Sequence, residues 1–290
     1  MKTIGIDIGG TQLRAAIFNE DHEMIDCFKT DNDRSLTAGQ NMDKLIDFLL
    51  GRPHPYKGIG VGCPGSLDIK QGKILCPPNL VGWDGFELVK YVEERTHIAT
   101  VLNNDANVAG LSEALLGAGA GYESVVFVGI STGIGGAYVY QGKLVNGANS
   151  NAAEFWNMIV NEDMHHHKNA NAGSLNEQGS GSGLGTIATE RYGRPMTPKE
   201  LFERYYEKDK LAVEIVERAA DVMAKGIANI TCIIDPDIII IGGSVAIHNV
   251  KFVEMIAEKA KKYTISPQSL KIELARFGDD AGLIGASLLV

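Results

Sequence analysis

Alternating apolar residues mark the start of the chain as two strands joined by a tight turn. The alternation runs from Ile4 to Asp7, a glycine pair follows, and a second alternating run continues to Ile17. This spacing predicts a strand, a turn at Gly9-Gly10-Thr11 and an antiparallel second strand. Glycine has no Cβ and can take positive φ, so the turn would let a charged ligand approach the backbone. An ordinary glycine-rich hairpin fits the same pattern.

The same pattern occurs again far along the chain. The apolar run 125–130 leads into Ser131-Thr132-Gly133, and the strand pattern resumes at 137–140. Two such hairpins facing each other across a cleft could hold the phosphates of a nucleotide from both sides. Asp7 would then act through a Mg²⁺ ion lying between its carboxylate and the phosphates. The repetition favours phosphate binding over two unrelated turns.

Further apolar patterns predict alternating strands and helices. Strands are expected at 24–28, 57–63, 99–102 and 238–241, and helices at 42–49, 86–96, about 106–116 and 211–230. Strands followed by helical crossovers are typical of an α/β layer architecture. The strand at 238–241 ends in Gly242-Gly243, where a flat group could approach the backbone, although a plain strand-to-helix turn fits as well.

Composition and charge narrow the class of protein. The 290 residues are 44% hydrophobic and 22% charged, which is typical of a soluble globular protein of one large or two ordinary domains. The net charge of −9 argues against non-specific nucleic-acid binding. No signal peptide opens the chain, no apolar run reaches the ~18 residues of a membrane span, and the four cysteines are scattered. A cytoplasmic protein with reduced thiols is expected.

One acidic residue stands where a strand pattern changes to a helix pattern. Asn103-Asn104-Asp105 follows the apolar run 99–102 and precedes helix-forming residues. Asparagine or aspartate at such a junction is a good helix N-cap. A carboxylate there could instead accept the proton of a hydroxyl that attacks the γ-phosphate of ATP. We favour the second interpretation.

In combination these motifs resemble the ROK family (repressors, open reading frames, kinases) of actin-like sugar kinases, over nearly the whole chain. The two hairpins, the segment 79–83 (NLVGW), the segment 103–107 (NNDAN) and the C-terminal 279–286 carry the resemblance. It implies an α/β fold of the actin-like ATPase (ribonuclease H-like) type, with two lobes and an interlobe cleft. The small lobe would comprise 1–117 plus 276–290 and the large lobe 118–275. It also implies ATP and Mg²⁺ as cofactors and a homodimer. The net charge and the lack of a long apolar run predict no nucleic-acid or membrane partner.

The resemblance also assigns roles to individual residues. Asp105 would be the catalytic base. The phosphates and adenosine of ATP would be bound by Asp7 (through Mg²⁺), Gly9, Gly10, Thr11, Thr132, Gly133, Gly242 and Gly243. The sugar would be bound by Gly65, Ser66, Asn79, Asn104, Asp105, Glu154, Asn157 and Asn176. For Asn79, a residue capping its own turn is the alternative.

The chain departs from the family pattern where typical members bind zinc. The segment 151–158 resembles the family's GExGH, but Asn157 replaces the histidine, and no cysteine lies between Cys76 and Cys232. We therefore expect no zinc site. The segment 173–176 resembles the family's GCLE, which places Asn176 at a sugar-binding glutamate, while Glu177 remains an alternative. His165, His166 and His167 are expected in an exposed loop rather than at a metal.

An ATP-dependent sugar kinase acting at O6 of a glucose-like hexose is the leading hypothesis. N-acetylmannosamine or a β-glucoside is the alternative substrate, because the cysteine-free segment resembles kinases of those sugars. A sugar-binding regulator without turnover is the alternative of another class, and retention of Asp105 argues against it.

Overall fold

The computed structural model describes residues 1–52, 55–77, 79–163 and 170–290, and these divide into two compact units. Unit 1 comprises Met1–Glu113, Asn146–Ala152 and Asp279–Val290, and unit 2 comprises Ala114–Val145 and Ala153–Gly278. The short segment 146–152 thus belongs to unit 1, whereas the residues on either side of it belong to unit 2. The expected lobe boundaries, after residue 117 and before residue 276, stay a prediction.

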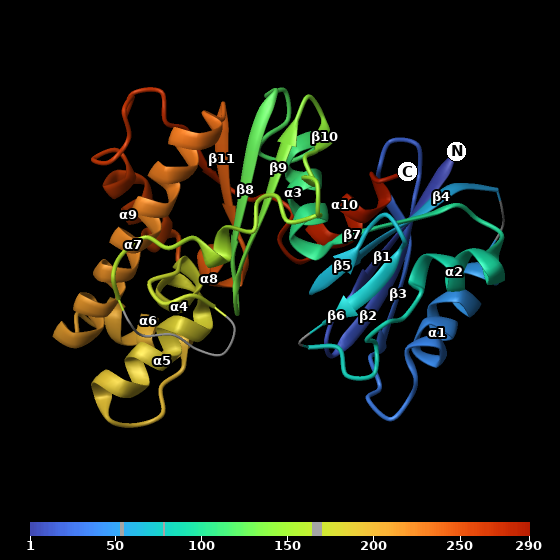
Figure 1. The fold of residues 1–290 in the computed structure, drawn as a ribbon, viewed down its shortest axis with the longest axis horizontal. Coiled ribbons are helices and arrows are strands. Elements are labelled where there is room, and N and C mark those ends of the chain that lie inside the picture. Colours follow the sequence, from blue (N-terminus) through green and yellow to red (C-terminus); the bar gives the residue numbers. More distant parts are fainter. Residues whose placement is uncertain (53–54, 78, 164–169) are drawn as a thin grey trace. The chain divides into compact units, whose positions relative to one another are not determined.

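Unit 1 is built on a five-stranded sheet in the order β3-β2-β1-β4-β7 (Figure 1). β1 pairs antiparallel with β2 and parallel with β4. Its strands are β1 (Lys2–Ile8), β2 (Gln12–Phe18), β3 (Met24–Asp31), β4 (Tyr56–Cys63) and β7 (Thr100–Asn104), with a separate ribbon of β5 (Ser66–Asp68) and β6 (Lys73–Cys76). Its helices are α1 (Ala38–Leu50), α2 (Leu88–Thr96), most of α3 (Asp105–Leu115) and α10 (Ala281–Ser287), which follows the short η2 (Gly278–Asp280).

Unit 2 is built on a second five-stranded sheet in the order β10-β9-β8-β11-β12. Its strands are β8 (Ser124–Ile130), β9 (Ile134–Tyr140), β10 (Lys143–Leu144), β11 (Ile238–Gly242) and β12 (Ile272–Leu274). Its helical elements are η1 (Phe155–Asn157), α4 (Leu175–Gly179), α5 (Gly181–Tyr192), α6 (Pro198–Tyr206), α7 (Lys210–Ile234), α8 (Ser244–His248) and α9 (Val250–Ala260).

The two sheets have the same plan. Each has three antiparallel strands followed by two parallel ones, so β8, β9 and β11 take the places of β1, β2 and β4. The two glycine- and threonine-containing turns therefore join equivalent strands. The prediction of a repeated hairpin is confirmed by this arrangement.

Each unit has its own apolar core. In unit 1 the core gathers β1, β2, β4, α1 and α2, with Trp83 fully buried. In unit 2 the core gathers β8, β11 and the apolar stripe of α7. The predicted helix at 211–230 is thus a core helix, as its spacing indicates.

Two glycines in the strands of unit 1 admit the last helix. A Cβ on Gly5 of β1 would lie 2.1 Å from the carbonyl oxygen of Leu283, and one on Gly60 of β4 would lie 1.7 Å from that of Ala286. Any side chain at these positions would push α10 off the sheet, so glycine is required by close approach of the backbones.

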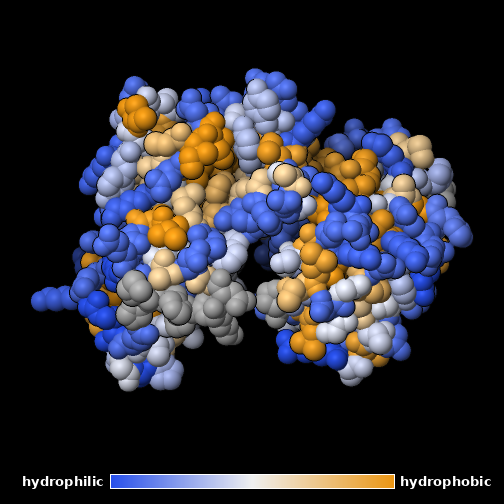
Figure 2. Space-filling view, viewed as in Figure 1, coloured by the Kyte–Doolittle hydropathy of each residue, from blue (hydrophilic) through white to orange (hydrophobic). Residues whose placement is uncertain are grey.

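Hydrophobic residues on the face drawn in Figure 2 are interspersed with hydrophilic ones. Among the described residues, no helix is long and apolar enough to span a membrane.

Candidate functional site

The turn between β1 and β2 is tight, but its glycines are needed for space rather than for positive φ. The N–H of Gly9 donates to the carbonyl of Gln12 at 2.8 Å, and neither Gly9 nor Gly10 has positive φ. A Cβ on Gly9 would lie 2.9 Å from the Gln12 carbonyl oxygen, and one on Gly10 would lie 2.9 Å from the carbonyl oxygen of Asn79. Positive φ, which glycine could have taken, is not used at this turn, and the missing Cβ atoms make room for the carbonyl oxygens of Gln12 and Asn79.

Asp7, the predicted magnesium residue, is paired with an arginine that the sequence analysis did not single out. Asp7 and Arg14 are directly opposed in the β1–β2 register, and Arg14 Nη2 donates to Asp7 Oδ2 at 2.6 Å. The same Nη2 donates to the carbonyl of Asp279 at 2.6 Å. The signal was available, because an acid and a base opposed across a hairpin form a favourable cross-strand pair.

The residues present around Asp7 suit a hard cation with oxygen ligands. Gly282 lies beside the carboxylate, and a Cβ there would come within 3.3 Å of Asp7 Oδ1. The missing side chain leaves that oxygen uncrowded, while Arg14 engages Oδ2. A carboxylate oxygen of this kind is the ligand type that Mg²⁺ prefers, often through water or phosphate.

Asn79 is exposed on a loop that two buried apolar residues anchor. Leu80 and Trp83 are 2% and 1% exposed, and the N–H of Trp83 donates to the carbonyl of Leu80 at 3.3 Å. Leu80 and Trp83 therefore anchor the loop in the core and leave the Asn79 amide at the surface. The contact with Gly10 places Asn79 beside the first hairpin.

Asp105 lies at the junction of β7 and α3, as predicted. The N–H of Ala106 donates to both Asn104 Oδ1 at 2.9 Å and Asp105 Oδ1 at 2.8 Å. Asn104 therefore accepts a hydrogen bond as a helix N-cap residue would, and Asp105 accepts from the same N–H. Both side chains are partly exposed.

A buried thiol lies close to two acidic residues of unit 1, Asp7 and Asp105. Burial raises the pKa of the Cys63 thiol well above its ordinary value, and the charges of Asp105 and Asp7 raise it further. Cys63 ends β4, where it is opposed to Asn104 of β7. A neutral thiol thus lies near the two carboxylates, and Asp7 and Asp105 belong to the same end of the sheet.

Gly65 and Ser66 follow directly after β4. Gly65 has φ of +96°, a conformation that favours glycine, and Ser66 is exposed at the start of β5. The bend that joins β4 to β5 therefore depends on Gly65.

In unit 2 the second hairpin turn is bound to the starts of two helices. Ser131 Oγ accepts from the N–H of Ser244 at 2.9 Å, and the carbonyl of Thr132 accepts from the N–H of Ser182 at 3.0 Å. Gly243 has φ of +86°, and a Cβ there would lie 2.5 Å from the carbonyl oxygen of Ile130. Gly133, Gly242 and Gly243 therefore surround one backbone junction, and Thr132 is exposed beside it.

A cavity of about 1280 Å³ opens next to this junction, entirely within unit 2. Its walls include Ser131, Thr132 and Ser244 together with residues of α5 and α6. Its lining mixes hydroxyl groups with apolar residues such as Phe202 and Val245, which is typical of sites for small organic ligands. Ser131 and Ser244 were not predicted as site residues, although they lie next to Thr132 and Gly243.

Glu154 precedes the short helix η1 and is exposed. Its carboxylate accepts from the indole N–H of Trp156. Desolvation by the surrounding protein raises the pKa of Glu154, and the Trp156 bond opposes that shift. Asn157 has a different environment, because its Oδ1 accepts from the N–H of Asn171 at 2.8 Å.

Asn176 is joined to the second hairpin. Its Oδ1 accepts from the N–H of Ile134 at 3.0 Å, and its Nδ2 donates to Glu177 Oε1 at 3.3 Å. Glu177 is 5% exposed, whereas Asn176 is partly exposed. The sequence left open whether Asn176 or Glu177 takes the sugar-binding position, and Asn176 is the more accessible of the two.

Within residues 1–52, 55–77, 79–163 and 170–290, no group of three or more histidine, cysteine or acidic side chains is arranged to hold a metal ion. The prediction for His165, His166 and His167 lies outside the described residues.

The structure brings the predicted residues together in two groups. Unit 1 holds Asp7, the first hairpin turn, Asn79, Asn104 and Asp105. Unit 2 holds Thr132, Gly133, Gly243 and Asn176 around the second turn. Glu154 and Asn157 lie on and beside η1 of unit 2.

Comparisons with known proteins agree with this arrangement. The family model described as ROK family matches residues 3–290. A glucokinase from Halalkalibacterium halodurans is 29% identical, with 99% of this chain and 94% of that protein covered.

Two solved structures share the whole fold. The ROK hexokinase from Thermus thermophilus has a TM-score of 0.93 and 29% identity, covering 99% of this chain and 97% of that one. A ROK family glucokinase from Streptomyces griseus, solved with glucose and AMPPNP, has a TM-score of 0.81 and 27% identity, covering 100% and 99%. The predicted actin-like fold with two lobes is confirmed by these likenesses, and the chain belongs to the ROK family.

Proposed function

We propose that this sugar kinase transfers the γ-phosphoryl group of ATP to O6 of glucose or a close hexose, with Asp105 as the base. The observation that carries the proposal is the position of Asp105 at the end of β7, beside Asn104 and in the same unit as Asn79 and Asp7. A carboxylate at a strand end can accept a hydroxyl proton directly, while neighbouring amides orient the other hydroxyls.

The reaction balances with residues of this chain. Asp105 takes the proton of the attacking hydroxyl, the sugar oxygen bonds to the γ-phosphorus, and the bond to the β-phosphate oxygen breaks, so ADP leaves. Asn79, Asn104 and Glu154 hold the sugar, with Gly65, Ser66, Asn157 and Asn176 as further candidates. The backbone of the turn at Gly9 and Gly10 meets the phosphates.

The nucleotide is assigned to the cavity of unit 2. Ser131, Thr132 and Ser244 line its end beside Gly243, where hydroxyl and N–H groups can bind phosphate oxygens. Apolar residues farther along, such as Phe202, suit the base. Asp7 would hold Mg²⁺ through the phosphates, and the ion would neutralise charge on the phosphoryl oxygens.

A homodimer, supported by the family resemblance, and a cytoplasmic location, supported by the scattered cysteines, complete the proposal. Light scattering of the purified protein tests the first, and fractionation of cells tests the second.

Coupled ADP-release assays over a panel of sugars test the substrate. The panel contains glucose, mannose, N-acetylmannosamine and a β-glucoside, and we expect the highest kcat/KM with glucose. A higher kcat/KM with N-acetylmannosamine or the β-glucoside would make that sugar the assigned substrate instead of glucose. Sugar binding without any ADP release would support the regulator class instead.

Asp105→Asn tests the base. The change barely alters size, so we expect sugar and ATP binding to persist while kcat falls by about 10²-fold or more, the scale of lost general-base catalysis. Asp21→Asn, at an exposed residue of the turn between β2 and β3, is the matched control. Near-full turnover of Asp105→Asn would reject the assignment.

A further inference from the structure

Asn103 is a buried amide that the proposed chemistry does not use. Its side chain is 3% exposed near the end of β7. Its Oδ1 accepts from the N–H of Asn104 at 2.8 Å and from Asn107 Nδ2 at 2.9 Å. These two bonds fix the turn that carries Asp105. Its Nδ2 points elsewhere and donates to Asn146 Oδ1 at 3.1 Å.

Asn146 begins the segment 146–152, which we call the strap. The strap is part of unit 1, although the chain on both sides belongs to unit 2. The N–H of Ala152 donates to the carbonyl of Asn146 at 3.2 Å, which closes the strap into a loop. Lys70 Nζ donates to the carbonyl of Ala148 at 3.4 Å. The bond from Asn103 is therefore a side-chain anchor at the strap's first residue.

The backbone of the strap is held in a conformation that needs anchoring. Ser150 has φ of +60°, and Ala153, directly after the strap, has φ of +63°. Residues other than glycine rarely take this backbone conformation, and it persists only where surrounding contacts impose it. Glu154 follows at once, so the anchor acts on the chain that leads into a proposed sugar ligand.

We infer that the Asn103–Asn146 bond is a positioning contact that holds the strap to the turn of the catalytic base and thereby sets the sugar affinity. The inference rests on the proposed function, since it assigns Asp105 and Glu154 as that function does. A buried amide is favourable only when its donors and acceptors are satisfied, and the strap supplies the acceptor for this donor. Neither asparagine contacts substrate in this scheme.

The pair can be tested by changing which of its two side chains donates and which accepts. In Asn146→Asp the carboxylate still accepts from Asn103. In Asn103→Asp the amide of Asn146 can rotate and donate to the new carboxylate, whose other bonds from Asn104 and Asn107 persist. The double variant places two acceptors face to face, so only the double variant loses the bond.

The expected result is therefore strongly non-additive. Each single variant should keep kcat/KM for the sugar within about threefold, whereas the double variant should lose at least about tenfold, the scale of an unmet buried hydrogen bond. The loss should lie in the KM for the sugar and leave the KM for ATP unchanged. Amide hydrogen exchange should become faster in peptides covering 146–153 in the double variant alone.

Other outcomes would overturn the inference. A double variant no worse than the product of the two singles would do so, as would an Asn146→Asp variant as impaired as the double. If the double variant does not fold, Asn146→Ala serves, since it removes the acceptor, and an unchanged sugar KM there would reject the anchor. Wild-type protein without sugar-dependent ADP release would reject the proposed function instead, while hydrogen exchange would still decide whether the pair holds the strap.

Discussion

At the scale of single residues, close contacts determine where glycine is required. Gly10 does not have positive φ, yet a Cβ would lie 2.9 Å from the carbonyl oxygen of Asn79. Gly243 combines positive φ with a contact of 2.5 Å to Ile130. The first turn is thus coupled to the loop that presents Asn79, a link between the proposed phosphate site and the proposed sugar site within unit 1.

Gly10→Ala should therefore weaken the binding of both the nucleotide and the sugar. The methyl group would displace Asn79 and narrow the approach of phosphate to the backbone. Crowding of this kind costs roughly 1–3 kcal/mol, so we expect each KM to rise about 5- to 150-fold. Calorimetric titration with sugar alone isolates the effect on Asn79. Gly51→Ala is the control, because a Cβ there would meet only ordinary contacts of 3.4 Å or more. Unchanged sugar affinity would remove Asn79 from the site.

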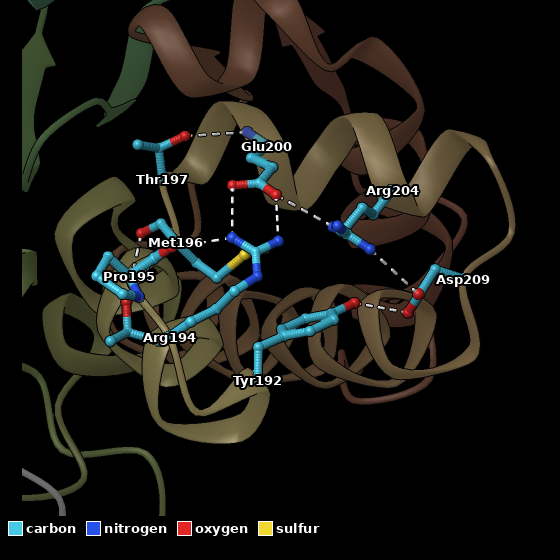
Figure 3. A network of polar contacts seen from close by, with 9 residues as sticks. Tyr192, Arg194, Pro195, Met196, Thr197, Glu200, Arg204 and Asp209 are labelled. Atoms are coloured by element: carbon cyan, nitrogen blue, oxygen red, sulfur yellow. Dashed lines mark hydrogen bonds and ion pairs between the residues drawn. The ribbon is translucent and has the colours of Figure 1, made fainter.

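At the scale of elements, α6 is held by a network of charged and polar groups (Figure 3). Glu200 accepts from Arg194 at 2.5 Å and from Arg204 at 3.3 Å, and Asp209 accepts from the hydroxyl of Tyr192 at 2.6 Å. The network joins the end of α5, α6 and the start of α7. Since residues 196–199 line the cavity of unit 2, it also fixes one wall of the proposed nucleotide site.

Glu200→Gln should lower the melting temperature at neutral pH. The hydrogen bond from Arg194 holds the pKa of Glu200 below its ordinary value of 4.5. Because the pKa of Glu200 is lower in the folded than in the unfolded protein, its ionised carboxylate stabilises the folded state above pH 4.5. This contribution is lost as the pH falls through the pKa of the folded state. The gap in melting temperature between wild type and variant should therefore close in acid.

Glu203→Gln is the control on the same helix. Glu203 pairs with Lys199 across 3.9 Å, and both side chains are largely exposed, so its loss should matter little. Equal effects of the two substitutions at every pH would show that the network does not hold α6.

The segment on either side of the undescribed residues 164–169 is held by amides. Asn161 and Gln178 exchange two hydrogen bonds, at 2.8 and 3.0 Å, and Gln178 is 2% exposed. Asn157 accepts from the N–H of Asn171 at 2.8 Å, which adds a third bond between the residues on the two sides. Leu175 is buried in the core of unit 2 and anchors the other end.

We predict that this segment needs no zinc. Amide oxygens are poor zinc ligands, and a structural zinc site would contribute directly to folding. Chelator treatment should leave the melting temperature and, with Mg²⁺ in excess, the kinase activity unchanged. Stoichiometric zinc in untagged protein, together with loss of activity on chelation, would show that His165, His166 and His167 bind the metal after all.

At the scale of the whole molecule, features that depend on local sequence patterns could be predicted, whereas features that depend on long-range contacts could not. The two hairpins, the strand at β4 and the core stripe of α7 follow from the spacing of apolar residues. The pair of Asp7 with Arg14 could have been read from the hairpin register. The strap and its anchor on Asn103 could not, because they join positions far apart in sequence that no local spacing connects.

The glycines in the sheet of unit 1 show the same difference between local and long-range features. Gly5 and Gly60 read as ordinary members of apolar strands, yet their role is to admit α10 from the opposite end of the chain. Likewise Asp105 could be placed at a strand end from its own neighbours, whereas the cavity of unit 2 depends on α5 and α6 meeting Ser131 and Ser244. The parts of a site that one segment makes were predictable, and those that several segments share were not.

The charge of the whole chain makes a last prediction, which concerns the regulator alternative. With a net charge of −9 and a pI of about 5.3, the protein repels the phosphates of DNA, and non-specific binding to DNA depends on basic groups that release its counterions. Fluorescence anisotropy with a labelled random duplex at low salt should show no saturable binding at ~10 µM protein, within the range where non-specific binders bind. The measurement is repeated with glucose and with ATP, since a ligand-dependent regulator could bind only in one state. Binding that weakens steeply with salt in any of these states would show a basic surface that the net charge conceals, and would favour the regulator class even for a chain that retains Asp105.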